Sequence, residues 1–410
     1  MLDDISGGKA AGQKIDSSRL HPFPARMPLT LAEHIIENMT TSDTVILDPM
    51  VGSGTTMIAA KRLGRLGMGF DLDPLAVLMT RVSTRTYNVN DINQTKNHIF
   101  VNAQEIANQK RLSYFKQDLS KQCRDFVQYW FPPASQKQLF ALAVSISQLQ
   151  KSSLKDLAWV VFSSLIIAKS SGASYAMDIS RSRPHKRLDK PLISPFDVWE
   201  ERFDSLIKRL PFTTDNNHDT KIDVKEGDAR SLNLADNSVD FVFTSPPYQN
   251  AVDYIRAHKF SLIWMGHNLD YLREIRGTMI GTERGLESLD GLPPKIETKL
   301  CQNLTEKPKQ AKMRRYLSDL GKSLSEIGRV LYPNGLAVLV LGPTMINSKR
   351  SDAADVISRI GKKYGFVLVG QTIRSLNSVR RSLPPPAIVN KQNDMGQRMR
   401  REVLVALRKR

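Results

Sequence analysis

The sequence predicts an α/β fold, a parallel sheet with helices on both faces, joined to a large helical insertion. Two short strands, residues 44–47 and 66–70, are each followed by a turn and a helix. Such a βαβα pattern is typical of parallel sheets covered on both faces. Residues 92–217 instead carry apolar residues at helical spacing among many Lys, Gln and Ser residues. The strand pattern then resumes and continues to residue 407.

The first third of the chain predicts elements in the following order. Residues 1–18 are polar and glycine-rich, which is typical of a flexible arm. Apolar spacing predicts a helix over residues 29–39 that covers one face of the first strand. Further helices are expected from Thr55 and from Pro74, where proline takes the favoured first turn. Within the insertion we expect three or four helices, packed as a bundle or against the sheet edge.

Past the insertion, strands are predicted at 221–226 and 239–244. A helix over 253–276 follows, and then a loop-rich segment, 277–312, with several Gly and Pro residues. An apolar stripe predicts an amphipathic core helix over 313–331, ended by Pro333-Asn334-Gly335. Strands are expected at 336–341, 366–373 and 402–407. The sheet domain is therefore assigned to residues 19–91 and 218–410.

A glycine-punctuated turn follows the first strand. Gly52 and Gly54 let backbone amides approach a ligand closely, and the helix from Thr55 adds its positive N-terminal end. The spacing fits neither the dinucleotide-binding fingerprint nor the P-loop, because no third glycine stands in register and no Gly-Lys-Ser/Thr follows. Asp71 ends the second strand, about 20 residues further on, where a carboxylate can accept from ribose hydroxyls. The half-site therefore favours a nucleoside over a phosphate chain.

The strand at 239–244 ends in Thr244-Ser245-Pro246-Pro247-Tyr248. Two prolines remove two backbone donors and hold the chain extended, so the strand breaks into a stiff loop. This loop presents a hydroxyl, carbonyl oxygens and an aromatic ring at the carboxyl end of a strand, where open α/β sheets bind ligands. An ordinary proline turn after a core strand would have the same sequence, and the glycine turn upstream is what favours a binding site.

Four segments, DPMVGSGTT (48–56), GFDLDP (69–74), EGDAR (226–230) and TSPPY (244–248), resemble a known family in their order and composition. The resemblance is to the S-adenosylmethionine-dependent DNA methyltransferases that modify exocyclic amino groups of cytosine or adenine. It covers residues 20–90 and 221–409. It implies a Rossmann-like seven-stranded methyltransferase sheet whose two closing strands form an antiparallel hairpin at the edge, and it implies S-adenosylmethionine as the cofactor.

The resemblance also assigns site residues. Asp48, Gly52 and Gly54 would line the methionine end of the cofactor, with the segment 21–27 touching it as well. Asp71 would bind the ribose and Asp228 the adenine amino group. The expected cofactor-binding residues are Phe23, Asp48, Pro49, Gly52, Ser53, Gly54, Thr55, Asp71, Leu72, Asp228, Ala229 and Thr244. The expected catalytic residues, which meet the target base, are Ser245, Pro246, Pro247 and Tyr248.

The available groups suggest a mechanism. An exocyclic amine is a poor nucleophile because its lone pair is delocalised into the ring. The Ser245 hydroxyl and the Pro246 carbonyl can accept hydrogen bonds from it and aim the lone pair at the methyl group. The base must be flipped out of the duplex and stacked on Tyr248. Neither Cys123 nor Cys301 follows a proline, as the nucleophile of carbon-5 cytosine enzymes does, and the motifs of zinc deaminases are missing.

Serine at the first position of the four-residue motif is typical of N4-cytosine enzymes in this family, whereas Asp or Asn is typical of N6-adenine enzymes. We therefore predict an N4-cytosine DNA methyltransferase, in a restriction-modification or related system, with N6-adenine as the alternative. An RNA amino-methyltransferase would be expected to carry Asp before the prolines. A non-catalytic DNA-binding protein would be expected to have lost residues such as Asp48, Asp71 and Ser245, all of which are intact.

The net charge of the chain indicates the class of its binding partner. The formal net charge of +18, from 59 Lys+Arg against 41 Asp+Glu, favours a polyanion. We expect double-stranded DNA, read by residues 92–217 and 277–312, and a cognate restriction endonuclease as a second partner. The basic loop 180–190, too polar to be core, is either a phosphate contact or a solvated linker. Its expected DNA-binding residues are Arg181, Arg183, Lys186 and Arg187.

Two cysteines provide neither a disulfide framework nor a zinc site, and no metal is expected. The longest apolar run, residues 157–168, is too short to cross a bilayer, and the N-terminal MLDD lacks the basic region of a secretory signal. We therefore expect a cytoplasmic protein without a membrane partner.

Overall fold

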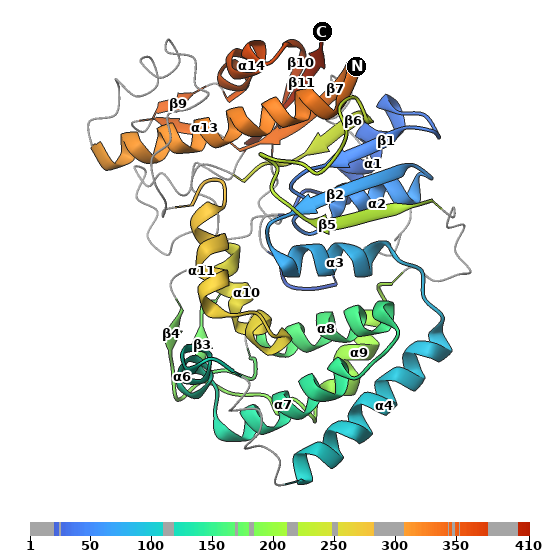
Figure 1. Ribbon diagram of the computed structural model, residues 1–410, viewed down its shortest axis with the longest axis vertical. Helices are drawn as coiled ribbons and strands as arrows, with labels where there is room; N and C mark the ends of the chain where they lie inside the picture. Colours follow the sequence, from blue (N-terminus) through green and yellow to red (C-terminus); the bar gives the residue numbers. More distant parts are fainter. Residues whose placement is uncertain are drawn as a thin grey trace.

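The computed structural model describes residues 20–23, 26–109, 119–168, 171–179, 184–210, 220–247, 253–282, 307–342, 344–346, 349–351, 353–375 and 401–410. Its centre is a seven-stranded sheet with the order β10-β11-β7-β6-β1-β2-β5 (Figure 1). The strands are β1 (Val45–Asp48), β2 (Leu66–Asp71), β5 (Ile222–Glu226), β6 (Val239–Thr244), β7 (Leu331–Leu341), β10 (Phe366–Ser375) and β11 (Arg401–Lys409).

The sheet is parallel from β5 to β7, and β11 runs antiparallel to both of its neighbours, β7 and β10. The predicted seven-stranded sheet and its closing antiparallel hairpin are thereby confirmed. Within the hairpin, β11 is the inner strand and β10 forms the edge.

Helices cover both faces of the sheet, as predicted. Side chains alternate along a strand, so Leu47 and Val242 join one hydrophobic cluster, with α13 and α14, while Ile46 and Phe241 join another, with α1 and α2. The helix α3 packs on this second cluster through Val77. Its opposite face, with Leu75 and Met79, packs on the helices of the insertion. These helices are α1 (Leu29–Met39), α2 (Thr55–Arg62), α3 (Pro74–Thr84), α13 (Lys307–Val330) and α14 (Ala353–Lys363).

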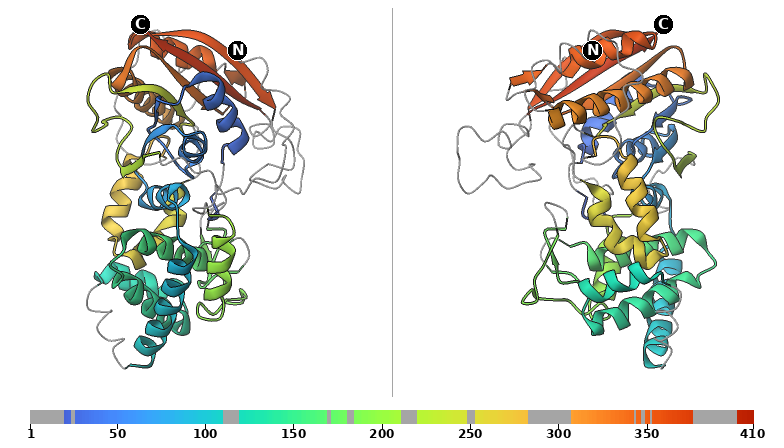
Figure 2. Two further views of the ribbon diagram at one scale, coloured as in Figure 1. Left: turned by 90° about the vertical axis from the view of Figure 1, so that its right-hand side faces the viewer. Right: turned by 60° about the vertical axis from the view of Figure 1, so that its left-hand side comes forward.

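A helical region occupies the end of the molecule opposite to β10 and β11 (Figures 1 and 2). Its hydrophobic cluster includes helices from the insertion and also α10 and α11, which follow the strand β6. The Phe260 ring of α10 lies 4.9 Å from Phe126 and 5.2 Å from Trp130, both on α6. The elements are α4 (Val89–Asn108), α6 (Lys121–Trp130), α7 (Pro133–Ser147), α8 (Ser152–Ile166), α9 (Trp199–Ile207), α10 (Tyr254–Leu262), the 3-10 helix η3 (Ile263–Met265) and α11 (Leu269–Thr278).

Several helix predictions need correction. The described part of the insertion contains five helices, α4 and α6 to α9, instead of three or four. The single helix expected over 253–276 is divided, because Gly266 takes a left-handed φ of 96° and ends η3. The helix α13 begins at Lys307, so residues 307–312, expected in a loop, are helical. Residues 283–306 of that expected loop lie outside the described residues.

The helix α13 also ends differently from the prediction. It stops at Val330, and Leu331 already pairs with Val239 in the sheet. Pro333-Asn334-Gly335 therefore does not terminate the helix but lies within β7, where Asn334 has a φ of 66° and the pairing with β6 shifts register. A left-handed residue bends the strand locally and lets it continue.

The basic loop 180–190 is partly a hairpin. The short strands β3 (Ala176–Met177) and β4 (His185–Lys186) pair antiparallel, and a second small sheet is formed by β8 (Thr344–Ile346) and β9 (Lys349–Ser351). Lys190, expected to be too polar for the core, is buried because its ammonium group donates to the carbonyls of Ser174 and Ala176 at 2.9 and 2.8 Å. Hydrogen bonding offsets the desolvation of the charge.

Among the residues that the structure describes, no helix combines the length and the apolar character that a bilayer crossing requires. Within the same part of the chain, no three His, Cys, Asp or Glu side chains gather into a metal site.

Candidate active site

The motifs that the sequence singled out meet at one edge of the sheet. Parallel strands place their carboxyl ends on the same side, and the register pairs Asp48 with Gly69 and Asp71 with Glu226. The turns after β1, β2, β5 and β6 therefore converge there, bringing Asp48, Asp71, Asp228 and Ser245 to this edge.

The glycine turn is shaped by two left-handed residues. Gly52, with a φ of 51°, donates its N–H to Asp71 Oδ2 at 2.9 Å. Gly54, with a φ of 83°, is the N-cap of α2, and a Cβ at this position would lie 2.8 Å from Thr80 Oγ1. A side chain at Gly54 is disfavoured both by the left-handed backbone and by the contact with Thr80. The Thr55 hydroxyl donates to Met27 O at 3.3 Å and ties the N-terminal segment to the turn.

Two carboxylates of this edge have altered acidity. Burial raises the pKa of Asp48 to about 6, and the hydrogen bond from the Met50 N–H opposes this shift. Loss of hydration raises the pKa of Asp71 to about 7, and repulsion from the Asp73 carboxylate adds to this shift. The hydrogen bonds that Asp71 accepts from the backbone N–H groups of Asp73 and Gly52 oppose it. A positively charged ligand would stabilise the ionised form of both groups.

An aromatic cluster lies over the glycine turn. A Cβ on Gly52 would be 3.5 Å from the Phe23 ring. Phe23 stacks on Tyr254 of α10, with ring centroids 4.6 Å apart and planes inclined by 12°. Burial raises the pKa of the Tyr254 hydroxyl, and the nearby charges of Asp71 and Asp73 add to this. Phe23, predicted from its motif, is thus joined by a residue from the helix that follows β6.

His258 lies one helical turn after Tyr254, and its Nδ1 is 2.5 Å from Asp73 Oδ2. Both side chains are buried. The other oxygen of Asp73 caps α3 by accepting from the Leu75 N–H at 3.0 Å. The contact therefore fixes α10 to the start of α3. Sequence reasoning missed Tyr254 and His258, although an aromatic pair four residues apart, beginning six residues after TSPPY, was a signal that could have indicated them.

The described start of the loop after β6 is held at two points. The Ser245 hydroxyl donates to Val340 O of β7 at 3.2 Å. Pro247 O accepts from the Tyr316 hydroxyl of α13 at 3.1 Å, and Phe243 O accepts from Thr56 Oγ1 at 3.2 Å. Since the Ser245 proton is directed at Val340, the serine oxygen can act toward a further partner only as an acceptor. Tyr248 lies outside the described residues.

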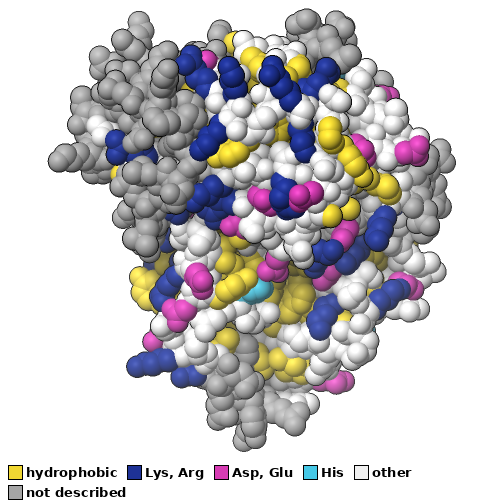
Figure 3. Space-filling view, turned by 45° about the horizontal axis from the view of Figure 1, so that its top comes forward, with side chains coloured by type: hydrophobic (Ala, Val, Ile, Leu, Met, Phe, Trp, Pro, Cys, Tyr) yellow, Lys and Arg dark blue, Asp and Glu magenta, His cyan; other side chains and the backbone are white. Residues whose placement is uncertain are grey.

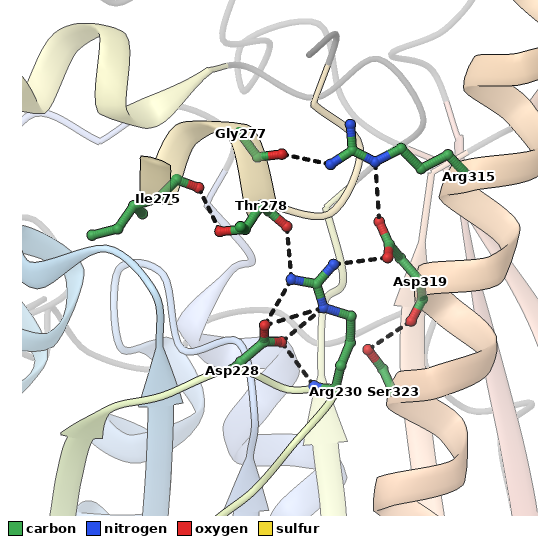
Figure 4. A network of polar contacts seen from close by, with 8 residues as sticks. All are labelled: Asp228, Arg230, Ile275, Gly277, Thr278, Arg315, Asp319 and Ser323. Atoms are coloured by element: carbon green, nitrogen blue, oxygen red, sulfur yellow. Dashed lines mark hydrogen bonds and ion pairs between the residues drawn. The ribbon is translucent and has the colours of Figure 1, made fainter. Parts of the chain in front are cut away.

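Asp228 belongs to an ionic network (Figure 4). Arg230 donates from its backbone N–H and its Nε to Asp228 Oδ1, both at 2.9 Å, and from Nη2 to Asp228 Oδ2 at 2.7 Å. The same guanidinium group donates to Asp319 Oδ1 and to Thr278 O, each at 2.7 Å. Asp228 is thus already bound by an arginine, with each of its two oxygens accepting two hydrogen bonds, an arrangement that sequence reasoning did not foresee.

The remaining predicted cofactor residues surround these groups. Ser53, Thr55, Ala229 and Thr244 are buried, and Leu72 is half-buried and packs against the helical cluster. Pro49 is also buried, directly after Asp48.

The expected DNA-binding residues differ in their surroundings. Lys186 lies over two aromatic rings, its Nζ 4.4 Å from the centroid of Tyr129 and 5.4 Å from that of Tyr175. Arg187 forms an ion pair with Asp189, with Nε 3.1 Å from Oδ1. Arg181 and Arg183 lie outside the described residues. Figure 3 shows Lys and Arg side chains gathered over the upper part of one face, where acidic side chains are fewer.

Comparison with known proteins gives the following matches. A family model described as DNA methylase matches residues 6–81, which contain the glycine turn and Asp71. Type II methyltransferase M.MvaI of Kocuria varians is 21% identical over 409 residues, covering 92% of this chain and 86% of its own length. M.MjaII of Methanocaldococcus jannaschii is 19% identical over 324 residues, 59% of this chain and 61% of its own length. M2.DpnII of Streptococcus pneumoniae is 50% identical over 50 residues, 12% of this chain and 19% of its own length.

These matches agree with the motifs at the sheet edge, and they do not distinguish cytosine N4 from adenine N6 as the methylated atom. A methyltransferase of this kind takes its methyl group from S-adenosylmethionine. The chain is thus similar to DNA methylases over its glycine turn and to type II methyltransferases over most of its length.

Proposed function

We propose that the protein is a site-specific DNA methyltransferase that methylates the N4 amine of a flipped cytosine in duplex DNA, as the modification partner of a type II restriction endonuclease. The observation that carries this proposal is the hydrogen bond from Ser245 to Val340 O. It leaves the serine oxygen as an acceptor at the sheet edge where the glycine turn, Asp71 and Asp228 converge.

The residues at this edge fit S-adenosylmethionine. The bound cofactor supplies an electrophilic methyl group on a positively charged sulfonium centre. Asp48 and Asp71, whose pKa values are raised by burial, complement a positive ligand. Gly54 is the N-cap of α2, so the free backbone N–H groups at the start of this helix would be available to the ligand. Asp71 would hold the ribose and Asp228 the adenine amino group.

The loop after β6, residues 245–248, is called the catalytic loop, and it would act on the amine by accepting hydrogen bonds from its N–H groups. Ser245 Oγ and Pro246 O are the acceptors we assign, because the Pro247 carbonyl is engaged by Tyr316. Two acceptors on one amine draw its geometry toward tetrahedral and localise the lone pair, an interaction that strengthens only as the transition state forms. Tyr248 would stack on the flipped base.

The choice of cytosine N4 rests on Ser245, since serine at this position is typical of the N4 enzymes of the family. N6-adenine methylation is the second candidate. It uses the same cofactor pocket and the same pair of acceptors, and it differs in the base that the pocket admits.

Duplex DNA as the substrate is supported by the net charge of +18 and by the Lys and Arg side chains in Figure 3. We assign base recognition to the helical insertion, residues 92–217, and to residues 277–312. The described helices of the insertion pack with α10 and α11, which directly follow the catalytic loop. This packing links the recognition region to the loop that holds the target base.

One experiment tests the proposal. The protein is incubated with labelled S-adenosylmethionine and mixed-sequence duplex DNA, and the DNA is digested to nucleosides. We expect the label in N4-methylcytosine, and sequencing of the same product gives the recognised site. Label in N6-methyladenine would select the second candidate. Label found only when RNA replaces DNA, or no label in either, would contradict the proposed function.

A further inference from the structure

One turn of α13, residues 315–319, reaches two separate parts of the site. The Tyr316 hydroxyl donates to Pro247 O in the catalytic loop at 3.1 Å. Three residues later, Asp319 Oδ1 accepts from Arg230 Nη1 at 2.7 Å, and Arg230 in turn binds Asp228. Residues three apart lie on the same face of a helix. A single helical face therefore contacts both the catalytic loop and the turn after β5, residues 227–231, called the Asp228 turn.

The catalytic loop depends on such a donor because of its own sequence. Pro246 and Pro247 have no N–H, so this part of the loop can be held only through its carbonyl oxygens. Tyr316 supplies a donor to one of them, and this residue is only 5% exposed, within the cluster that covers one face of the sheet. A buried ring has little rotational freedom, so the hydroxyl fixes the position of the Pro247 carbonyl.

The Asp228 turn depends on Asp319 in a similar way. Arg230 binds both carboxylates, and the side chain of Asp319 is only 8% exposed, that of Arg230 16%. Removal of the Asp319 charge would therefore weaken one of the contacts that orient Arg230 against Asp228. Arg230 and Arg315 also bind the last carbonyls of α11, those of Thr278 and Gly277 (Figure 4). The network thereby joins α13, α11 and the Asp228 turn.

We propose that this turn of α13 positions both halves of the site: Tyr316 sets the catalytic loop, and Asp319, acting through Arg230, sets Asp228 for the cofactor. The inference rests on the proposed function, because it uses the assignment of Asp228 to the cofactor and of the loop to the amine. Both are positioning residues. Its consequence is that two substitutions in one helical turn affect different kinetic parameters.

Tyr316→Phe removes only the hydroxyl. We expect kcat for DNA methylation to fall roughly three- to tenfold, as for the loss of one hydrogen bond to a carbonyl. The dissociation constant of S-adenosylmethionine, measured by calorimetry, should stay unchanged. Tyr332→Phe is the matched control, since Tyr332 is 46% exposed on β7. In a crystal structure of Tyr316→Phe, the Pro247 carbonyl should be displaced relative to the wild type.

Asp319→Asn keeps the size of the side chain and removes its charge. We expect the dissociation constant of S-adenosylmethionine to rise about tenfold, as for a weakened charge-assisted contact, with a smaller effect on kcat at saturating cofactor. Asp319→Glu, which keeps the charge, should recover most of the affinity. Asp236→Asn is the control, because Asp236 forms an ion pair with Arg329 on the surface and is 69% exposed.

The inference is overturned if both variants lose turnover and cofactor affinity equally and in step with their thermal stability, because α13 would then be a structural support alone. Failure of the proposed function looks different. A wild-type protein that binds the cofactor and methylates no DNA contradicts the proposed function, whereas the cofactor affinity of Asp319→Asn and the Pro247 position in Tyr316→Phe still test the inference.

Discussion

Asp71 Oδ2 accepts the N–H of Gly52 at 2.9 Å, so the carboxylate that ends β2 also holds the glycine turn that follows β1. The hydrogen bond ties the shape of the turn to the charge of Asp71. Burial and the neighbouring acid Asp73 nevertheless raise the pKa of this carboxyl to about 7. Turn shape, cofactor binding and pH are therefore expected to be linked.

The first prediction concerns pH. Asp48 and Asp71 have folded pKa values of about 6 and 7, raised from 3.8. Because both pKa values are raised by folding, the protonated carboxyl groups favour the folded state of the ligand-free protein. This stabilisation is fully present below about pH 4 and is lost as pH rises through 6 to 7. A cationic ligand favours the ionised carboxylates, so the dissociation constant of S-adenosylmethionine should fall as pH rises from about 5.5 to about 8. Calorimetry across this range measures it, and Asp71→Asn should flatten the profile.

Two outcomes would contradict this linkage. One is a cofactor affinity of the wild type that does not change over this pH range. The other is an Asp48→Ala or Asp71→Ala variant with wild-type affinity at about pH 8, where we expect each to be weaker by tenfold or more, about 1.4 kcal/mol per lost charge-assisted contact.

The second prediction concerns Gly54. Its φ of 83° disfavours any side chain, and a Cβ would lie 2.8 Å from Thr80 Oγ1 and 2.9 Å from Thr80 Cγ2. We expect Gly54→Ala to lower the free energy of unfolding by about 1–3 kcal/mol through backbone strain and crowding. Chemical denaturation measures this change. Gly277→Ala is the control, because a Cβ there would meet no atom within 4 Å.

A Gly54→Ala variant as stable as the control would show that the turn relaxes without cost. If Thr80→Ala restores the stability of Gly54→Ala, crowding against Thr80 causes most of the destabilisation. If it does not, the left-handed backbone conformation causes most of it.

The third prediction separates two basic residues. DNA affinity should fall steeply with salt, by about 0.9 in the log-log slope for each neutralised phosphate. Arg187 is paired with Asp189, whereas Lys186 lies over the rings of Tyr129 and Tyr175. Lys186→Ala should therefore reduce the slope by about 0.9, and Arg187→Ala by less. Binding titrations between low and physiological salt measure both slopes.

Arg359→Ala provides a control, since Arg359 forms a comparable exposed pair with Asp355 on α14. Equal slopes for the wild type and Lys186→Ala would assign the hairpin β3–β4 to a solvated surface and remove it from the DNA interface.

The sequence predicted those parts of the fold and site that local chemistry determines. Gly52, Gly54 and the Pro246-Pro247 pair mark turns by their own backbone preferences, and the strands around them have short, strongly apolar patterns. Contacts between distant segments could not be predicted in this way. The bond between Arg230 and Asp319 spans 89 positions, and that between Tyr316 and Pro247 spans 69.

Tyr316 shows why such contacts are hidden. Its place in an apolar stripe correctly predicted a core residue, and it is 5% exposed. The stripe carries no information about which group its hydroxyl meets, because that depends on how α13 crosses the sheet. Lys190 shows the reverse: its charge predicted exposure, and two carbonyls of the folded chain made burial favourable.

The last prediction concerns Ser245. If its oxygen accepts a hydrogen bond from the amine, Ser245→Ala should lower kcat by about 10² or more, because that bond strengthens in the transition state. Cofactor affinity should stay nearly unchanged. The variant also loses the hydrogen bond to Val340 O, so a stability loss of up to about 1.5 kcal/mol is expected in addition. Ser245→Thr keeps the hydroxyl and should retain more turnover than Ser245→Ala. If instead Ser245 only ties the loop to β7, turnover would fall in proportion to thermal stability and by no more than the lost hydrogen bond allows, roughly tenfold. Turnover, cofactor affinity and thermal stability measured on the same samples therefore decide whether this hydroxyl takes part in methyl transfer or only supports the loop.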